Sequence, residues 1–180
     1  MSLIRRSLNF IYDATGYLAA FFVFAIFVVM IGQTIMRELG MRTGGTDDIV
    51  AWMCAASAFL AMADTFKRGD FVRVGLLIEH LGPRMRYVFE LWSLAIATAF
   101  CGYLAFWACR FTYESWQFND MANGLIVIPM WIPQLSFVAG ALILCLAVAD
   151  EFVIVLRGRR PSYVTAVEER HARGDFSEDV

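Results

Sequence analysis

The chain has 180 residues, of which 59% are hydrophobic, 15% aromatic and 18% charged, and its formal net charge is −2. Soluble domains carry about 25% charged residues, so this composition excludes an ordinary soluble domain and indicates an integral membrane protein. The charges are confined to loops and ends, and no stretch is basic enough to indicate binding to nucleic acid.

Four stretches have the composition of membrane-spanning helices. A hydrocarbon core about 30 Å thick needs roughly 20 apolar residues in helical form. Three uncharged runs have 23, 15 and 19 residues, and a fourth has 29, which is too long for one simple span. The sequence therefore predicts an all-α integral membrane protein with four transmembrane helices. The expected spans cover about 14–36, 48–66, 88–109 and 133–156.

The first span is bounded by Asp13 and Arg37. Its apolar run is long for a cleaved signal peptide, and no polar cleavage region follows it. We therefore expect it to be retained as a transmembrane helix.

An acidic pair opens the second span, in the stretch GTDDIVAW. Asp47 and Asp48 are expected in the first helical turn, where the helix dipole favours acids, and Thr46 can cap the helix. Capping alone would explain these residues. Contact with a partner protein is the alternative.

Small residues recur along the same span. Ala51 and Ala55 are four residues apart, and so are Ser57 and Ala61. Such spacing lets transmembrane helices approach closely. It serves either the packing of this chain's own helices or the contact of a partner helix.

The connection between the second and third spans mixes charged and apolar residues at about 70–82. It is too short to cross the bilayer, so we expect an amphipathic helix lying in the membrane interface. The third helix is expected to continue beyond its span through the stretch RFTYESWQFND. Residues 1–161 then form a four-helix membrane domain, and 162–180 form a polar, poorly ordered tail.

Two prolines interrupt the last apolar run. Proline lacks a backbone N–H and is tolerated best in the first turn of a helix, so Pro133 is expected to begin the fourth span. Residues 121–132 are expected to be irregular, with Trp131 at the headgroup level that tryptophan favours. The segment is either a helix start alone or also a fixed outer surface beside the GTDD stretch.

The distribution of basic residues predicts the orientation. Of the 15 Lys and Arg residues, 12 fall on the side of the termini and of the 2–3 connection, and three fall on the other side. Basic residues near span ends favour the cytoplasm. Both termini are therefore expected to be cytoplasmic.

The spans offer few groups for chemistry. Asp64, Glu90 and Asp150 lie near predicted span ends, and charged groups deeper in a membrane would be the usual functional candidates. His80 and His171 lie outside the spans, and the four cysteines have no CxxC spacing. We expect no enzyme, and no catalytic, cofactor-binding or metal-binding residue.

Two stretches carry a resemblance to a known family. The stretch GTDDIVAWMCAASAFLAMADTFKRGDFVRV resembles the small membrane subunit of tripartite ATP-independent periplasmic (TRAP) transporters, the DctQ-like family. That family has a Gly-containing loop, an acidic pair opening helix two, a small-residue helix and a basic exit. IPMWIPQLSFVAG is similar to its proline-flanked approach to helix four, and the resemblance covers roughly residues 10–157.

The chain departs from the family pattern in three places. Its acidic pair is aspartate rather than the commoner glutamate, and Asp70 and Phe71 stand where relatives often have histidine after the basic exit. A second helix-four proline is absent near Val138. These differences affect the transfer of individual contacts rather than of the architecture.

The resemblance implies a small permease subunit in the bacterial inner (cytoplasmic) membrane. Such a subunit forms a stable heterodimer with a large membrane subunit and contacts a periplasmic solute-binding protein transiently during sodium-driven uptake of an organic acid. Sodium ions are expected in the large subunit, with no cofactor in this chain. The alternative is a free-standing four-helix transporter or membrane scaffold. The candidate partner-interface residues are Asp47, Asp48, Ala51, Ala55, Pro129, Met130, Trp131 and Pro133.

Overall fold

The computed structural model describes residues 3–41, 44–68, 82–158 and 164. Within them lie four helices, each long and apolar enough to cross a membrane, which confirms the predicted all-helical class. The expected interfacial helix, apart from Gly82, and the tail, apart from Val164, lie outside the described residues. The helices are α1 (Leu3–Glu38), α2 (Thr46–Arg68), α4 (Pro83–Gln117) and α5 (Trp131–Leu156).

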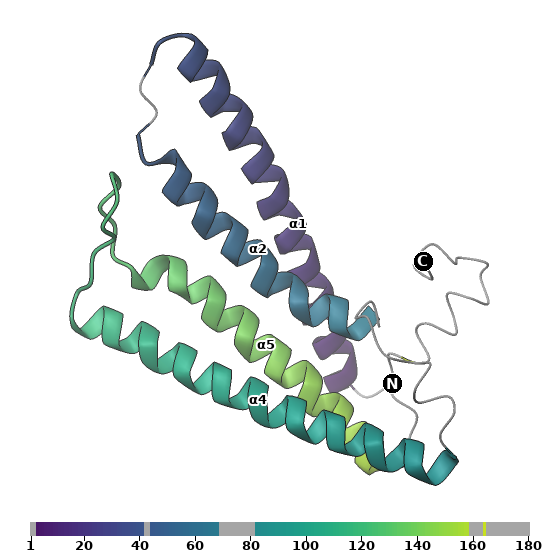
Figure 1. Ribbon diagram of the computed structural model, residues 1–180. Helices are drawn as coiled ribbons and strands as arrows, with labels where there is room; N and C mark the ends of the chain where they lie inside the picture. Colours follow the sequence, from purple (N-terminus) through teal and green to yellow (C-terminus); the bar gives the residue numbers. More distant parts are fainter. Residues whose placement is uncertain (1–2, 42–43, 69–81, 159–163, 165–180) are drawn as a thin grey trace, which may run out of the picture.

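The helices lie side by side in the order α1, α2, α5, α4 (Figure 1). Contacts join α1 to α2, α2 to α5 and α5 to α4, so α1 and α4 form the two edges. One end of the molecule holds the starts of α1 and α4 and the ends of α2 and α5; we call it the terminal end. The opposite end holds the α1–α2 and α4–α5 connections, and we call it the loop end.

The helix boundaries follow from local chemistry. Gly40 ends α1 with φ of 75°, a left-handed conformation that glycine adopts without steric cost, and its N–H bonds to the carbonyl of Arg37 at 3.0 Å. The next helix, α2, carries acids in its first turn and Lys67 and Arg68 in its last. Both placements are favourable to the helix dipole.

The core is thin and consists of small clusters between neighbouring helices. Leu94 and Cys101 of α4 pack with Val148 and Val155 of α5. α2 and α5 approach each other closely at Gly140, where an added Cβ would lie 2.6 Å from the backbone carbonyl carbon and oxygen of Phe59. A glycine is therefore needed there because the two backbones leave no room for a side chain.

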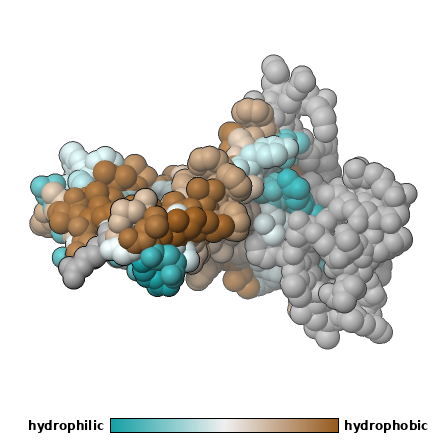
Figure 2. All heavy atoms as spheres, turned by 90° about the horizontal axis from the view of Figure 1, so that it is seen from above, coloured by the Kyte–Doolittle hydropathy of each residue, from teal (hydrophilic) through white to brown (hydrophobic). Residues whose placement is uncertain are grey.

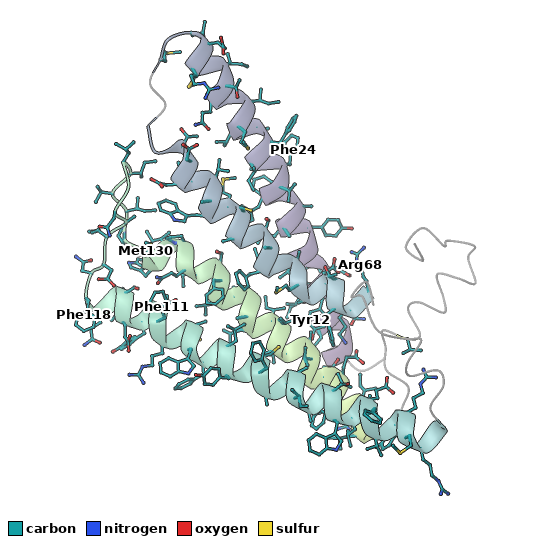
Figure 3. The ribbon with its side chains drawn as sticks, in the orientation of Figure 1. Tyr12, Phe24, Arg68, Phe111, Phe118 and Met130 are labelled. Atoms are coloured by element: carbon teal, nitrogen blue, oxygen red, sulfur yellow. The ribbon has the colours of Figure 1, made fainter. Side chains whose placement is uncertain are left out.

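Most of the apolar side chains face outward. Phe24 on α1 and Phe100 on α4 are 64% and 67% exposed, and Phe24 projects away from the neighbouring helices in Figure 3. Figure 2 shows hydrophobic residues over much of the described surface on the face that it presents. An apolar surface of this extent requires lipid or protein around it.

The edge helices are longer than a bilayer requires. At 1.5 Å per residue, the 35 residues of α4 extend about 52 Å, against a hydrocarbon core of about 30 Å. The helix continues past the expected span end at 109 to Gln117. Its last turns carry Phe111, Tyr113 and Trp116, which are all exposed, toward the loop end.

Candidate functional site

The α4–α5 connection forms a compact hairpin at the loop end. The Met121 and Pro129 backbones pair as an isolated antiparallel bridge. The Ala122 N–H donates to the Ile128 carbonyl at 2.9 Å, and the Met130 N–H donates to the Asp120 carbonyl at 2.8 Å. The connection, residues 118–130, is thus held by its own backbone bonds; we call it the loop-end hairpin.

The tip of the loop-end hairpin contacts the start of α2. Gly124 lies against the carboxylate of Asp48, so close that a Cβ there would overlap it. The side chain of Ile126 covers Gly45 in the same way, and Leu125 lies beside Gly44. The structure therefore brings the proline-flanked segment and the GTDD stretch into one composite surface.

The two acids of this surface have different surroundings. Asp47 is exposed and accepts a hydrogen bond from Gln33 Nε2 of α1 at 3.0 Å. Asp48 is partly buried and lies under the hairpin. Both residues are in the first turn of α2, where the helix dipole is favourable to acids. Asp47 also links α2 to α1, and Asp48 brings α2 into contact with the hairpin.

The residues that follow the hairpin start α5 earlier than expected. Trp131 is the first helical residue rather than part of an irregular segment that extends to 132, and Met130 is the N-cap residue. Pro133 lies in the first turn, where its missing N–H is not needed. Because the backbone bonds of the hairpin finish at Met130, the chain can become helical immediately. All four candidates from Pro129 to Pro133 are partly buried: Pro129, Met130, Trp131 and Pro133.

The two pairs of small residues in α2 face different ways. Ser57 is buried, and its Oγ donates to the Cys54 carbonyl at 2.8 Å. Ala61 is partly buried. Ala51 and Ala55 are exposed instead, on the side of α2 that the other described helices leave uncovered. One pair therefore serves packing within the chain, and the other is open to lipid or a partner.

A charged cluster at the terminal end was missed by the sequence reasoning. Lys67 Nζ of α2 donates to Asp150 Oδ2 and to Glu151 Oε1 of α5, both at 2.9 Å. The Glu151 side chain is fully buried, and that of Lys67 is 13% exposed. The same Nζ lies 5.2 Å from the ring centroid of Tyr12 on α1, so one lysine links three helices. We call these four residues the lysine cluster.

The sequence contained a partial signal for the lysine cluster. Asp150 lies near a predicted span end, as the sequence indicates. Glu151, the residue after Asp150, is on the inner face of α5 with the buried residues Ala147, Val148 and Val155. Lys67 lies one helical turn after an uncharged run, and Asp150 and Glu151 are consecutive acids near the end of another span. This pattern could have indicated the pairing.

The described residues include no group of three or more His, Cys, Asp or Glu side chains that could hold a metal ion. The ion pairs found among the described residues include those of Lys67 with Asp150 and Glu151 and two i,i+4 pairs, Arg68–Asp64 and Arg110–Glu114, of which the second is exposed. The described residues present two kinds of contact surface. One is a composite acidic and apolar face at the loop end, and the other is the exposed faces of the helices.

Comparison with known proteins gives the family. No curated protein matches the chain in sequence. The sequence profile of the DctQ component of tripartite ATP-independent periplasmic transporters matches residues 26–158. This range contains α2, α4, α5, the last third or so of α1 and both parts of the loop-end surface. The chain belongs to the DctQ family, the small membrane components of TRAP transporters.

Proposed function

We propose that the chain packs on the large membrane subunit of a TRAP transporter and helps to dock a periplasmic solute-binding protein during sodium-driven uptake of an organic acid. The substrate and sodium sites belong to the large subunit in this proposal. The chain's own contribution is a membrane scaffold and an outer surface.

The observation that carries the docking role is the composition of the loop-end surface. The loop-end hairpin exposes Leu125 and Val127, which are 80% and 69% exposed. Asp48 lies against Gly124 at this tip, Asp47 precedes it in the first turn of α2, and Asp120 lies at the base of the hairpin. An apolar centre with a polar rim is the usual anatomy of a protein interface, and the acids favour a partner with a basic patch.

Packing on a large subunit is supported by the open faces of the helices. Ala51 and Ala55 leave a shallow stretch on α2 where a partner helix can approach closely. In a membrane, helices gain little from hydrophobic burial alone, so such close packing is a main source of association. We therefore assign the stable contact to the membrane faces and the transient contact to the loop end.

The proposed orientation places the terminal end in the cytoplasm and the loop end outside. Its support is the count of Lys and Arg in the sequence, of which 12 out of 15 belong to the two terminal segments and to the segment between the second and third spans. The bacterial inner membrane is the setting that this orientation and a periplasmic partner require.

The experiment compares two variants in a system with a large TRAP subunit of the same organism. Trp131→Ala removes the side chain at the start of α5 and should weaken co-purification with the large subunit. Asp47→Asn with Asp48→Asn should leave co-purification intact and lower uptake when binding protein is limiting. Added salt should reduce uptake by the parent more than uptake by this double variant, because the variant has lost the charges that salt screens. Glu114→Gln, an exposed loop-end acid paired with Arg110, is the matched control and should behave like the parent.

The alternative function is a free-standing four-helix transporter or scaffold. It would be favoured if the chain purified as its own oligomer and no large subunit came with it. The proposal is rejected if both variants assemble and support uptake like the parent.

A further inference from the structure

Three arginines gather at the terminal end of α4 and α5. Arg84 and Arg86 are in the first turns of α4, and Arg157 directly follows the end of α5. All three are exposed, and within the described part of the chain none of them forms an ion pair. They contrast with Arg68 and Arg110, each of which forms an ion pair with a carboxylate four residues away.

A hydrogen bond fixes the relative position of these two helix ends. Tyr87 Oη of α4 donates to the Val155 carbonyl of α5 at 3.3 Å. Arg84 precedes Tyr87 by three residues and so lies on the same side of α4, one turn nearer the helix start. Arg157 follows Val155 by two residues. The start of α4, which carries Arg84, thus lies beside the end of α5, which Arg157 follows. Arg86 lies two residues beyond Arg84 and therefore on the opposite side of α4.

The surroundings of this seam are apolar and aromatic. Phe89 and Trp92, on the next turns of α4, are 52% and 65% exposed. Leu156, at the end of α5, is 51% exposed. Tryptophan is enriched at the headgroup level of membranes, where its ring is partly in the hydrocarbon and its N–H is near water. Basic groups that have no ion-pair partner among the described residues therefore lie within about two helical turns of side chains suited to acyl chains.

We propose that the seam between the two helix ends, with Arg84 and Arg157 at its sides, binds the headgroup phosphate of an anionic phospholipid, whose acyl chains lie along the exposed face of α4; we call it the arginine seam. The guanidinium groups complement the phosphate in charge and geometry, because each can donate two parallel hydrogen bonds. Basic pockets between transmembrane helices are known to take anionic headgroups. The site depends on the helices spanning a membrane and is independent of the transport role.

The test is native mass spectrometry of the full chain released from detergent after addition of phosphatidylglycerol or phosphatidylcholine. The parent should retain phosphatidylglycerol at least tenfold better than phosphatidylcholine. Each juxtamembrane basic residue contributes about a fivefold change in affinity for an anionic lipid. Arg84→Gln with Arg157→Gln should therefore weaken phosphatidylglycerol binding roughly 25-fold, by the same principle.

Two controls separate the seam from general effects. Arg84→Lys with Arg157→Lys keeps both charges and should restore most of the binding. Arg110→Gln, at the loop end of α4, should leave it unchanged. Equal retention of the two lipids, or unchanged retention by the double Gln variant, would overturn the proposal. Displacement of the lipid by millimolar inorganic phosphate would also overturn it, because the seam would then be a site for a free anion.

Discussion

Replacing Lys67 by methionine tests whether the lysine cluster holds α2 and α5 together. The substitution removes the ammonium group that contacts Asp150 and Glu151, each at 2.9 Å, while methionine keeps most of the side-chain volume. The Glu151 carboxylate is fully buried, so it cannot turn toward water. Asp150 is 26% exposed and can do so in part.

The expected cost follows from this geometry. At an effective dielectric constant of about 20, one contact at this distance is worth about 6 kcal/mol before desolvation is subtracted. Removing one partner of a buried pair leaves an uncompensated charge and costs about 3–5 kcal/mol. We therefore expect Lys67→Met to lower the free energy of unfolding by about 3–5 kcal/mol, with α2 separating from α5 at the terminal end.

The assay is unfolding of the purified chain in mixed micelles with increasing SDS, followed by tryptophan fluorescence and circular dichroism. Glu151→Gln is the informative companion, because it keeps the shape and leaves Lys67 paired with Asp150. We expect a loss of about 1 kcal/mol or less for it, as for a single replaced hydrogen bond. In the Glu151→Gln background, Lys67→Met should cost less than in the parent, since one fewer carboxylate is stranded.

The matched control is Arg110→Gln, which breaks the exposed Arg110–Glu114 pair. Exposed pairs contribute about 0–1 kcal/mol, so this variant should unfold like the parent. The reasoning fails if Lys67→Met and Arg110→Gln have the same small effect, or if the Lys67→Met cost is unchanged in the Glu151→Gln background.

Three further predictions concern the helix contact, the hairpin and the orientation. Gly140→Ala should lower the free energy of unfolding by about 1–3 kcal/mol, because the added methyl meets the Phe59 backbone. The control Gly102→Ala, whose Cβ would meet nothing within 4 Å, should be neutral or stabilising. Equal effects of the two substitutions on the free energy of unfolding would refute the close contact at Gly140. Gly124→Ala should displace the loop-end hairpin from Asp48 and speed amide exchange across it, measured by hydrogen exchange, whereas Asn123→Ala at an exposed position should not. Single cysteines at Thr43 and Asn119 should react with a membrane-impermeant thiol reagent added outside cells in a background without native cysteines, and a cysteine at Ser162 should not; outside labelling at Ser162 would reject the orientation.

The sequence predicted those parts of the fold that depend on local chemistry. Uncharged length located the four helices, and the acids of α2 and Pro133 of α5 identified helix starts, since each acts within its own first turn. The proximity of the proline segment to the GTDD stretch followed from topology alone, because both connect helices at the same end.

The contacts between helices could not be predicted in the same way. α1 and α4 carry large apolar residues on all sides, so periodicity does not show which side meets a neighbour. The pairing of Lys67 with Glu151 and the approach of Gly140 to Phe59 depend on the register of α2 against α5. That register is set by shape across residues about 80 positions apart in the sequence, which no local pattern records.

The central claim is that this chain is an accessory subunit, and reconstitution tests it most directly. Proteoliposomes would contain the chain alone, a large TRAP subunit of the same organism alone, or both, with a sodium gradient, the cognate binding protein and its radiolabelled organic acid outside. Sodium-dependent uptake is expected only when both membrane subunits are present. Uptake by this chain alone, or undiminished uptake by the large subunit without it, would show that the chain is not an accessory subunit.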